Sequence, residues 1–307
     1  MDITRLDASS QNLTWKQGSN DLDSGQRTIV FAFFLFASVV GLVGNLIVFW
    51  YLCFKIQRNK YTIYINNLSA ADALLETVAV IILMVNINTF NGPNPEFNGK
   101  QSFVLSLTIL YYAMIYTGMF LLTAISTERC VSALFPIWNT VRRPRHLSTI
   151  MCCFAWAIGS LESLLQHFVC GTENTGKCLP IGVLNFVLAI GICLPLMVIS
   201  SLILLIKIKR TFRQRYPPKL YIIIIVAAVV FTLSVLPLNT VRFLLYCNLT
   251  ADKNTLHKMV TVTEFWMIVN SAINPCIYFL VGRRWNRCTC YSIKDTLNRA
   301  FTVDIND

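Results

Sequence analysis

The 307-residue chain alternates long apolar stretches with short polar and basic segments. A helix needs about 20 mainly apolar residues to cross the hydrocarbon core of a bilayer, which is roughly 30 Å thick. Every apolar stretch of this chain is long enough to do so. The pattern therefore predicts an all-α membrane protein, a seven-transmembrane helix bundle, with helices at residues 28–54, 61–90, 102–134, 147–169, 179–206, 220–246 and 259–281.

Composition supports this class. Hydrophobic residues make up 55% of the chain and charged residues only 13%, which argues against a soluble domain of this length. The net charge of +11 lies mostly beside the apolar stretches, and no basic and aromatic soluble module accompanies it. Membrane lipid is therefore an expected partner and nucleic acid is not. The 11 cysteines show no metal-ligand spacing with histidines, so we expect no metal site of that kind.

The distribution of basic residues predicts the orientation. Most of the 26 Lys and Arg fall in alternate loops and in the tail, and by the positive-inside rule that side is cytoplasmic. We therefore expect an extracellular arm at residues 1–27, the helical bundle at 28–282, and a cytoplasmic amphipathic helix and tail at 283–307.

The sequence offers candidates for two kinds of covalent modification. Asn12 and Asn248 each begin a glycosylation sequon on the outer side. Cys288 and Cys290, beside the amphipathic tail helix, are candidates for palmitoylation. Ordinary reduced thiols are nearly as good an interpretation of these two cysteines.

Two adjacent charges, Glu128 and Arg129, close the third apolar stretch just before it would leave the membrane. A charge at that depth is costly unless it is solvated or paired, so the doublet is a candidate functional site. The plainer alternative is that Arg129 extends its side chain to the membrane interface.

Besides Glu162, four further charges lie inside predicted helices. Asp72 and Glu76 are four residues apart on one helix face, so they must face the bundle interior and find a proton, a cation or polar partners there. Arg242 and Glu264 lie on adjacent helices at similar depth. They either pair with each other or contact a ligand.

Several function classes receive no support. No nucleophile-base or metal constellation indicates an enzyme. The sequence shows neither the pore-lining rings or filter loop of a channel nor the two related halves of an inverted-repeat transporter. A retinal protein would need a lysine in the last helix, where the sequence has none.

One residue pattern in each predicted helix resembles the rhodopsin-like G-protein-coupled receptors. The resemblance covers nearly the whole chain and implies a receptor with this fold in the plasma membrane. The residues that carry it are Asn45, Leu68–Asp72, Glu128–Cys130, Trp156, Pro195, Pro237 and Asn274–Tyr278.

Finer patterns resemble the Mas-related receptors: Ser126–Cys130, Phe135–Trp138, Arg143–Ser148 and Asn270–Pro275. The chain lacks the cysteine that rhodopsin-like receptors usually place at the outer start of the third helix. The Mas-related resemblance instead implies a disulfide between Cys170 and Cys178, which flank a short loop on the oxidising side.

The resemblance also implies a mechanism. An outside agonist shifts the bundle towards a state that opens to a heterotrimeric G protein, of the Gi or Gq class. Arg129 pairs with Glu128 at rest, Pro237 is the flexible point of the sixth helix, and Asn274, Pro275 and Tyr278 complete the switch. The tryptophan common two residues before that proline is Val235 here, so an aromatic toggle is not implied. The alternative is a membrane channel or transporter without G-protein coupling.

A polar network of Asp72, Asn270 and Asn274 resembles the sodium site of such receptors, and a sodium ion is the one cofactor that the resemblance suggests. The polar residue expected on the third helix is Gly118, which weakens that expectation, and plain polar packing is the alternative.

The ligand is expected to be a peptide or a small molecule. Some Mas-related receptors bind cationic ligands with acids at the positions of Gln166 and Gly182, neither of which is acidic here. Glu162 or Glu264 can compensate, so the charge of the ligand stays open. The candidate pocket residues are Asn86, Tyr111, Tyr112, Gln166, Asn185, Arg242, Glu264 and Trp266.

Overall fold

The structure, a computed structural model, describes the backbone of residues 24–91, 100–170, 175–211, 219–247, 253–282, 293–294 and 296–297. Within these ranges the regular structure is helical throughout. The helices are α2 (Ser24–Phe54), α3 (Lys60–Asn91), α4 (Lys100–Leu134), α5 (Pro136–Val141), α6 (Leu147–Cys170), α7 (Thr175–Phe186), the π-helix η2 (Val187–Cys193), α8 (Leu194–Thr211), α9 (Lys219–Tyr246) and α10 (Lys253–Gly282).

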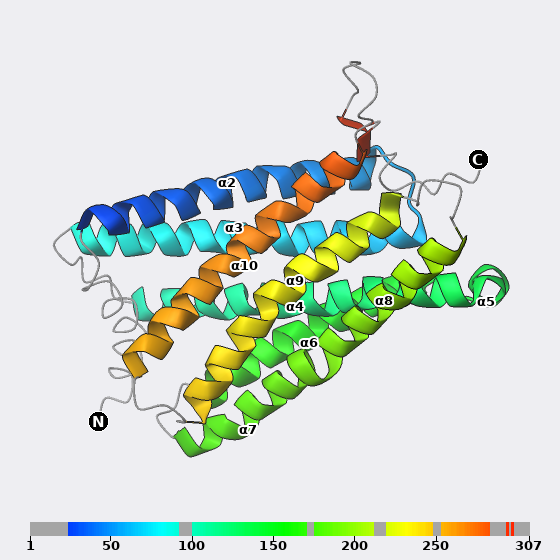
Figure 1. The fold of residues 1–307 in the computed structure, drawn as a ribbon. Coiled ribbons are helices and arrows are strands. Elements are labelled where there is room, and N and C mark those ends of the chain that lie inside the picture. The colour runs from blue at the N-terminus through cyan, green and yellow to red at the C-terminus, as the bar shows by residue number, and fades with distance from the viewer. Residues whose placement is uncertain are drawn as a thin grey trace.

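The long helices form an antiparallel bundle in which successive members run in opposite directions (Figure 1). Helix α4 lies at the centre and contacts α3, α6, α8 and α9. Helix α2 packs on α3 and α10, and α10 packs on α9. This order brings the middle of α3, α4 and α10 together, where the buried apolar core includes Leu68, Met119 and Ile268.

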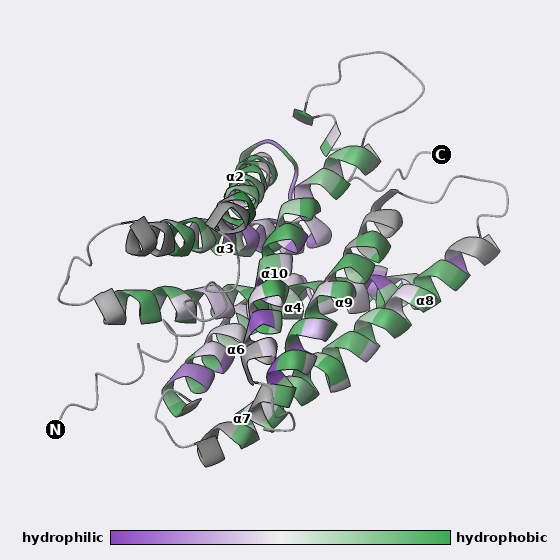
Figure 2. Cartoon of the chain, turned by 60° about the vertical axis from the view of Figure 1, so that its left-hand side comes forward, coloured by the Kyte–Doolittle hydropathy of each residue, from purple (hydrophilic) through white to green (hydrophobic). Residues whose placement is uncertain are grey.

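The outward-facing surface of the bundle is largely apolar, as expected for a membrane protein. Five described helical segments are long and apolar enough to cross a bilayer, and Ala228–Leu244 of α9 is a shorter apolar helix. Hydrophobic residues predominate along the helices, with hydrophilic residues at intervals within α6 and α10 (Figure 2). Large apolar side chains such as Phe33 and Phe36 of α2 point outward, which suits contact with lipid tails.

Small residues allow two close helix contacts. A Cβ at Gly44 would lie 2.9 Å from the side chain of Pro275, so α2 and α10 meet without an intervening side chain. A Cβ at Gly159 of α6 would lie 2.6 Å from the backbone nitrogen of Thr117 on α4. Close approach at small residues is the usual way in which membrane helices associate.

Local sequence explains where α3 begins. The side-chain oxygen of Asn59 accepts hydrogen bonds from the backbone N–H groups of Tyr61 and Thr62, at 2.9 and 2.8 Å. The backbone N–H of Asn59 in turn donates to the hydroxyl of Thr62, at 2.8 Å. This reciprocal capping satisfies donors that have no partner inside the helix.

The fifth predicted helix is continuous but changes geometry inside the membrane. Helices α7 and α8 are joined by η2, and the N–H of Leu194 donates to the carbonyl of Ala189, five residues back. Pro195 follows directly and has no N–H, so the ordinary helical hydrogen-bond pattern is interrupted at this point in any case. The apolar pattern predicts this helix but gives no signal for its wider turns.

Several predicted features lie outside the described residues. They are the arm up to residue 23, both sequons (Asn12 and Asn248), Cys288, Cys290, and the side chains of Asn86, Cys170 and Cys178. Of the predicted tail helix, four residues are described. Among them, Leu297 is fully buried in the hydrophobic core.

Candidate functional site

A buried cluster of polar side chains lies in the half of the bundle away from α5. It gathers residues from five helices: Tyr111, Tyr112 and Tyr116 on α4, Glu162 and Gln166 on α6, Asn185 on α7, Arg242 on α9 and Glu264 on α10. We call these eight residues the outer cluster. Apart from Tyr112, whose ring is partly covered, all of them are buried.

An ion pair between Arg242 and Glu264 forms the centre of the outer cluster. The guanidinium donates to the carboxylate at 3.0 Å. The hydroxyl of Tyr112 donates to the same carboxylate oxygen, and its ring lies 4.0 Å beneath the guanidinium. Tyr111 adds a hydrogen bond to the backbone oxygen of Glu264, at 3.0 Å. These contacts tie α4, α9 and α10 together through one charge pair.

A second group completes the outer cluster on the side of α6 and α7. The hydroxyl of Tyr116 donates to the side-chain oxygen of Gln166, and the amide of Asn185 lies 3.2 Å from that oxygen. Arg242 reaches the hydroxyl of Tyr116 at 3.4 Å. One hydrogen-bonded network therefore runs from α6 to α10, with the three tyrosines of α4 in its middle.

The opposite end of the bundle holds the predicted charge doublet, but in a different arrangement. Glu128 forms its ion pair with Arg143, in the segment between α5 and α6, rather than with Arg129. The guanidinium of Arg129 lies over the ring of Tyr61 on α3, 3.0 Å from its centroid. The expected Glu128–Arg129 pair is thus corrected. Consecutive residues of a helix point in different directions and do not face each other.

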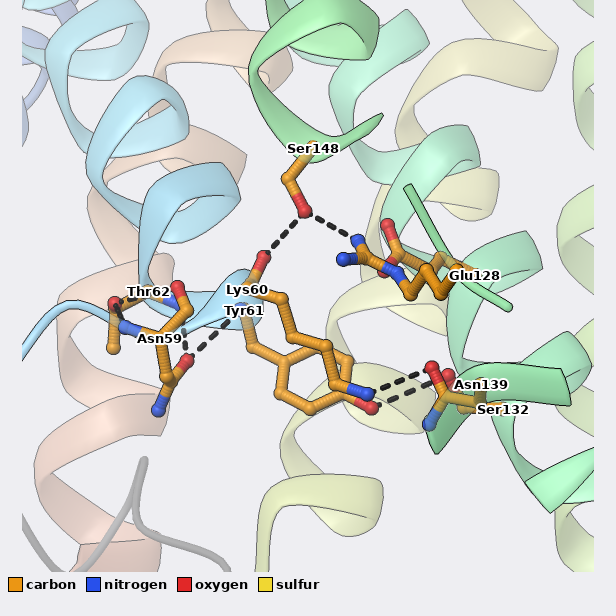
Figure 3. A network of polar contacts seen from close by, with 9 residues as sticks. Asn59, Lys60, Tyr61, Thr62, Glu128, Ser132, Asn139 and Ser148 are labelled. Atoms are coloured by element: carbon orange, nitrogen blue, oxygen red, sulfur yellow. Dashed lines mark hydrogen bonds and ion pairs between the residues drawn. The ribbon is translucent and has the colours of Figure 1, made fainter. Parts of the chain in front are cut away.

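Further hydrogen bonds make this inner end a network. Ser148 of α6 accepts from Arg143 at 2.6 Å and donates to the backbone oxygen of Lys60 at 2.9 Å. Figure 3 shows Ser148 between the start of α3 and Glu128. The side chain of Lys60 reaches Asn139 of α5 at 2.7 Å, and the hydroxyl of Tyr61 reaches Ser132 at 3.2 Å.

A small cavity of about 20 Å³, enough for about one water molecule, lies beside this network. It is lined by α3, α4 and α10, with Tyr61, Tyr64, Leu68, Arg129 and Tyr278 on its walls. Arg129 is only 2% exposed and Tyr278 is equally buried, so both predicted switch residues face an enclosed space rather than open solvent. The inner end thus holds a buried cation beside a small cavity.

Between the two ends lies the predicted polar network. The amide of Asn274 donates to Asp72 at 2.7 Å, and Asn45 donates to the backbone oxygen of Ser271 at 3.3 Å. Asn270 is buried on the same helix as Asn274. At Gly118 a Cβ would meet only Leu68, at 3.9 Å, so α4 contributes no polar group there.

Comparison with known proteins identifies the family of this chain. A family model described as 7 transmembrane receptor (rhodopsin family) matches residues 44–278. The chain belongs to this receptor family. It is 34% identical over 269 residues to the mouse protein Proto-oncogene Mas, covering 86% of this chain and 81% of that protein. It is also 34% identical over 272 residues to Mas-related G-protein coupled receptor member D of Macaca fascicularis, covering 87% and 82%. Human Mas-related G-protein coupled receptor member X1 is 35% identical over 271 residues, covering 86% and 80%.

These likenesses confirm the resemblance found in the sequence. The protein is a G-protein-coupled receptor of the Mas-related type and not an enzyme, and it crosses the membrane several times. The family has an extracellular ligand and a G protein as partners.

Six of the eight predicted pocket residues lie in the outer cluster. Trp266 is 47% exposed and lies outside the outer cluster. It is two residues from Glu264 on α10, and residues at that spacing point to different sides of a helix. The side chain of Asn86 lies outside the described residues.

Sequence reasoning did not place Tyr116 in the pocket and gave Glu162 only a secondary role. A signal for both was present. Tyr116 follows Tyr112 by four residues and Glu162 precedes Gln166 by four, so each shares a helix face with a predicted pocket residue.

Proposed function

We propose that the receptor lies in the plasma membrane with its amino terminus outside, binds a peptide or small molecule at the outer cluster, and activates a G protein of the Gi or Gq class. The buried ion pair of Arg242 and Glu264 carries this proposal. It joins two helices to each other and, through Tyr112, to the central helix α4.

An agonist acts here by competing for partners that the resting cluster already uses. A ligand that hydrogen-bonds to Arg242, Glu264 or Tyr112 replaces one or more of the contacts between α4, α9 and α10. Any preference of the ligand for the rearranged cluster shifts the bundle towards that state by the same free energy. Pro237 lies inside α9, five residues before Arg242, where a helix lacks one hydrogen bond and bends readily.

The inner end receives the signal. In the active receptor Arg129 leaves the ring of Tyr61 and meets the G protein, while Arg143 continues to neutralise Glu128. The contacts in this structure support this division of roles, because Arg129 and Glu128 have different partners. On α10, Asn274 bonds to Asp72 of α3 and Tyr278 lines the inner cavity, so this helix carries predicted switch residues between the two ends.

Further parts of the proposal rest on the sequence. They are the outward amino terminus, the Cys170–Cys178 disulfide, glycosylation at Asn12 and Asn248, lipid attachment at Cys288 or Cys290, and contact of the tail with membrane lipid. Each is consistent with the positive-inside distribution of Lys and Arg.

The experiment begins with a screen of peptides and small molecules against cells that express the full receptor, read out separately on Gi and Gq. An agonist from that screen is then applied to Arg129→Ala. We expect loss of agonist-stimulated nucleotide exchange at unchanged surface expression. Arg145→Ala is the matched control, because Arg145 is an exposed arginine at the same end of the bundle.

Two outcomes would contradict the proposal. Normal exchange in Arg129→Ala would remove the assigned role of that residue. Ion current or substrate flux through the purified receptor in liposomes, without any G-protein response, would favour a channel or transporter.

A further inference from the structure

Glu162 of α6 is the acid of the outer cluster that has no ion pair with any described residue. It is 4% exposed, and its Oε2 has no hydrogen-bond partner. Its other carboxylate oxygen lies within reach of Asn185. With the amide turned so that its nitrogen faces Glu162, Asn185 donates to Oε1 at 3.2 Å. A buried acid with one oxygen unsatisfied is costly, so Glu162 calls for a further donor.

The outer cluster contains two acids and a single guanidinium. In this structure the carboxylate of Glu264 has Arg242 at 3.0 Å and also accepts from the hydroxyl of Tyr112. Arg242 is also the charged group whose field acts on Glu162. One cation therefore serves two buried carboxylates on different helices, and it is bonded to one of them.

The other contacts of Arg242 lead towards Glu162. The guanidinium reaches the hydroxyl of Tyr116 on α4 at 3.4 Å. The side-chain amide of Asn185 lies 3.3 Å from the same hydroxyl. Because Asn185 is also the residue that reaches Glu162, these two polar side chains link the guanidinium to the second acid.

The part of α9 that carries Arg242 packs against α7, the helix that carries Asn185. The ring of Phe243, the residue after Arg242, stacks on the ring of Phe186, the residue after Asn185, with centroids 4.3 Å apart. Pro237 lies inside α9, five residues before Arg242, and a proline is a point at which a helix bends. A change of bend there displaces the guanidinium between α10 and α6.

We propose that agonist binding transfers Arg242 from Glu264 to Glu162. This inference rests on the proposed function of the outer cluster and names the rearranged state towards which the agonist shifts it. In that state the guanidinium satisfies the unpartnered oxygen of Glu162, while Glu264 keeps the hydroxyl of Tyr112. The agonist supplies the second donor to Glu264, so it carries an N–H or O–H group at this point.

The first test needs neither an agonist nor a G protein. The full receptor is purified in detergent, and its thermal unfolding is compared with that of Glu264→Gln, in which Glu162 is the acid left for Arg242. In the Glu264→Gln background, adding Glu162→Gln should lower the unfolding temperature by several degrees, because it removes the new ion pair. In the receptor that keeps Glu264, the same change should lower it by about one degree or less.

The second test measures basal nucleotide exchange in membranes that contain the receptor and its G protein. Glu264→Gln should raise it several-fold, because Arg242 is released to Glu162 without an agonist. Adding Glu162→Gln should return it close to the wild-type rate. Thr240→Ala on the same helix is the control and should leave the rate unchanged, because the hydroxyl of Thr240 donates to the carbonyl of Leu236 within α9, at 2.7 Å.

Two outcomes would overturn the exchange. Equal shifts of the unfolding temperature in the two backgrounds would show that Glu162 is satisfied where it lies and does not receive Arg242. Basal exchange that stays raised in the double variant would place the new partner of Arg242 elsewhere. Should Glu264→Gln fail to fold, Tyr112→Phe takes its place, because it removes the hydroxyl that shares the carboxylate of Glu264.

Failure of the proposed function would look different. A receptor without any G-protein response, in which Glu162→Gln still acts on unfolding only in the Glu264→Gln background, would keep the exchange and lose the proposed function. A receptor that answers an agonist through Arg129, but in which Glu162→Gln acts equally in both backgrounds, would keep the function and lose the exchange.

Discussion

The contact between Arg129 and Tyr61 predicts that the aromatic ring holds the receptor in its resting state. The guanidinium lies 3.0 Å from the ring centroid and is 2% exposed, so the pair is close to the desolvated limit. A cation–π contact of that kind contributes about 2 kcal/mol. If the active state gives up the contact, Tyr61→Leu raises the ratio of active to resting receptor by roughly 30-fold.

The assay is basal nucleotide exchange in membranes that contain the receptor and its G protein, without agonist. Tyr61→Phe is the matched control, because it keeps the ring and removes only the hydroxyl that reaches Ser132 at 3.2 Å. We expect basal exchange to rise strongly in Tyr61→Leu and only a few-fold in Tyr61→Phe. Equal rises in the two variants would assign the restraint to the hydroxyl. No rise in Tyr61→Leu would refute the role of the ring.

Three further predictions concern stability and coupling, each measured by thermal unfolding of purified receptor. Arg143→Ala should destabilise the resting fold by about 2–3 kcal/mol, because it leaves Glu128 without its cation, and adding Glu128→Gln should restore most of the loss. A double-mutant cycle of Arg242→Gln and Glu264→Gln should give a coupling energy of about 2–3 kcal/mol, and additive effects would show that the pair is not the centre of the outer cluster. Gly159→Ala should cost roughly 1–3 kcal/mol, because its Cβ would enter the backbone of α4, and a neutral result would mean that the two helices separate easily.

Helix positions could be predicted closely from the sequence because the membrane fixes both length and polarity. The apolar stretch at residues 102–134 corresponds to α4 (Lys100–Leu134), and the stretch at 220–246 corresponds to α9 (Lys219–Tyr246). The hydrocarbon thickness sets a minimum length, and a charge or a turn residue marks each end. The π-helix before Pro195 was not predictable in this way, because hydropathy carries no signal for the hydrogen-bond register within a helix.

Side-chain partners could be predicted only where the helix and the depth of each residue could be assigned. Arg242 and Glu264 were recognised as a possible pair because their helices and depths could be assigned. The resemblance implies a pair of Glu128 and Arg129, yet adjacent side chains of a helix point in different directions. The true partner of Glu128, Arg143, lies in the segment between α5 and α6, whose path no periodic pattern specifies.

The two ends of the receptor share one structural element, and this determines what can move. Helix α4 carries Tyr112 of the outer cluster and Arg129 of the inner network. At the inner end it is held to neighbouring segments by Tyr61 of α3 and by Arg143, which Ser148 links to α6.

At the outer end α4 contacts α9 and α10 through the hydroxyls and rings of Tyr111, Tyr112 and Tyr116. The hydroxyl of Tyr116 also joins α4 to α6 and α7. Under the proposed function, a ligand at the outer cluster would move α9 and α10 relative to α4. Because Tyr278 of α10 and Arg129 of α4 line the same inner cavity, that displacement would alter the space around the guanidinium, although the ligand would not reach it.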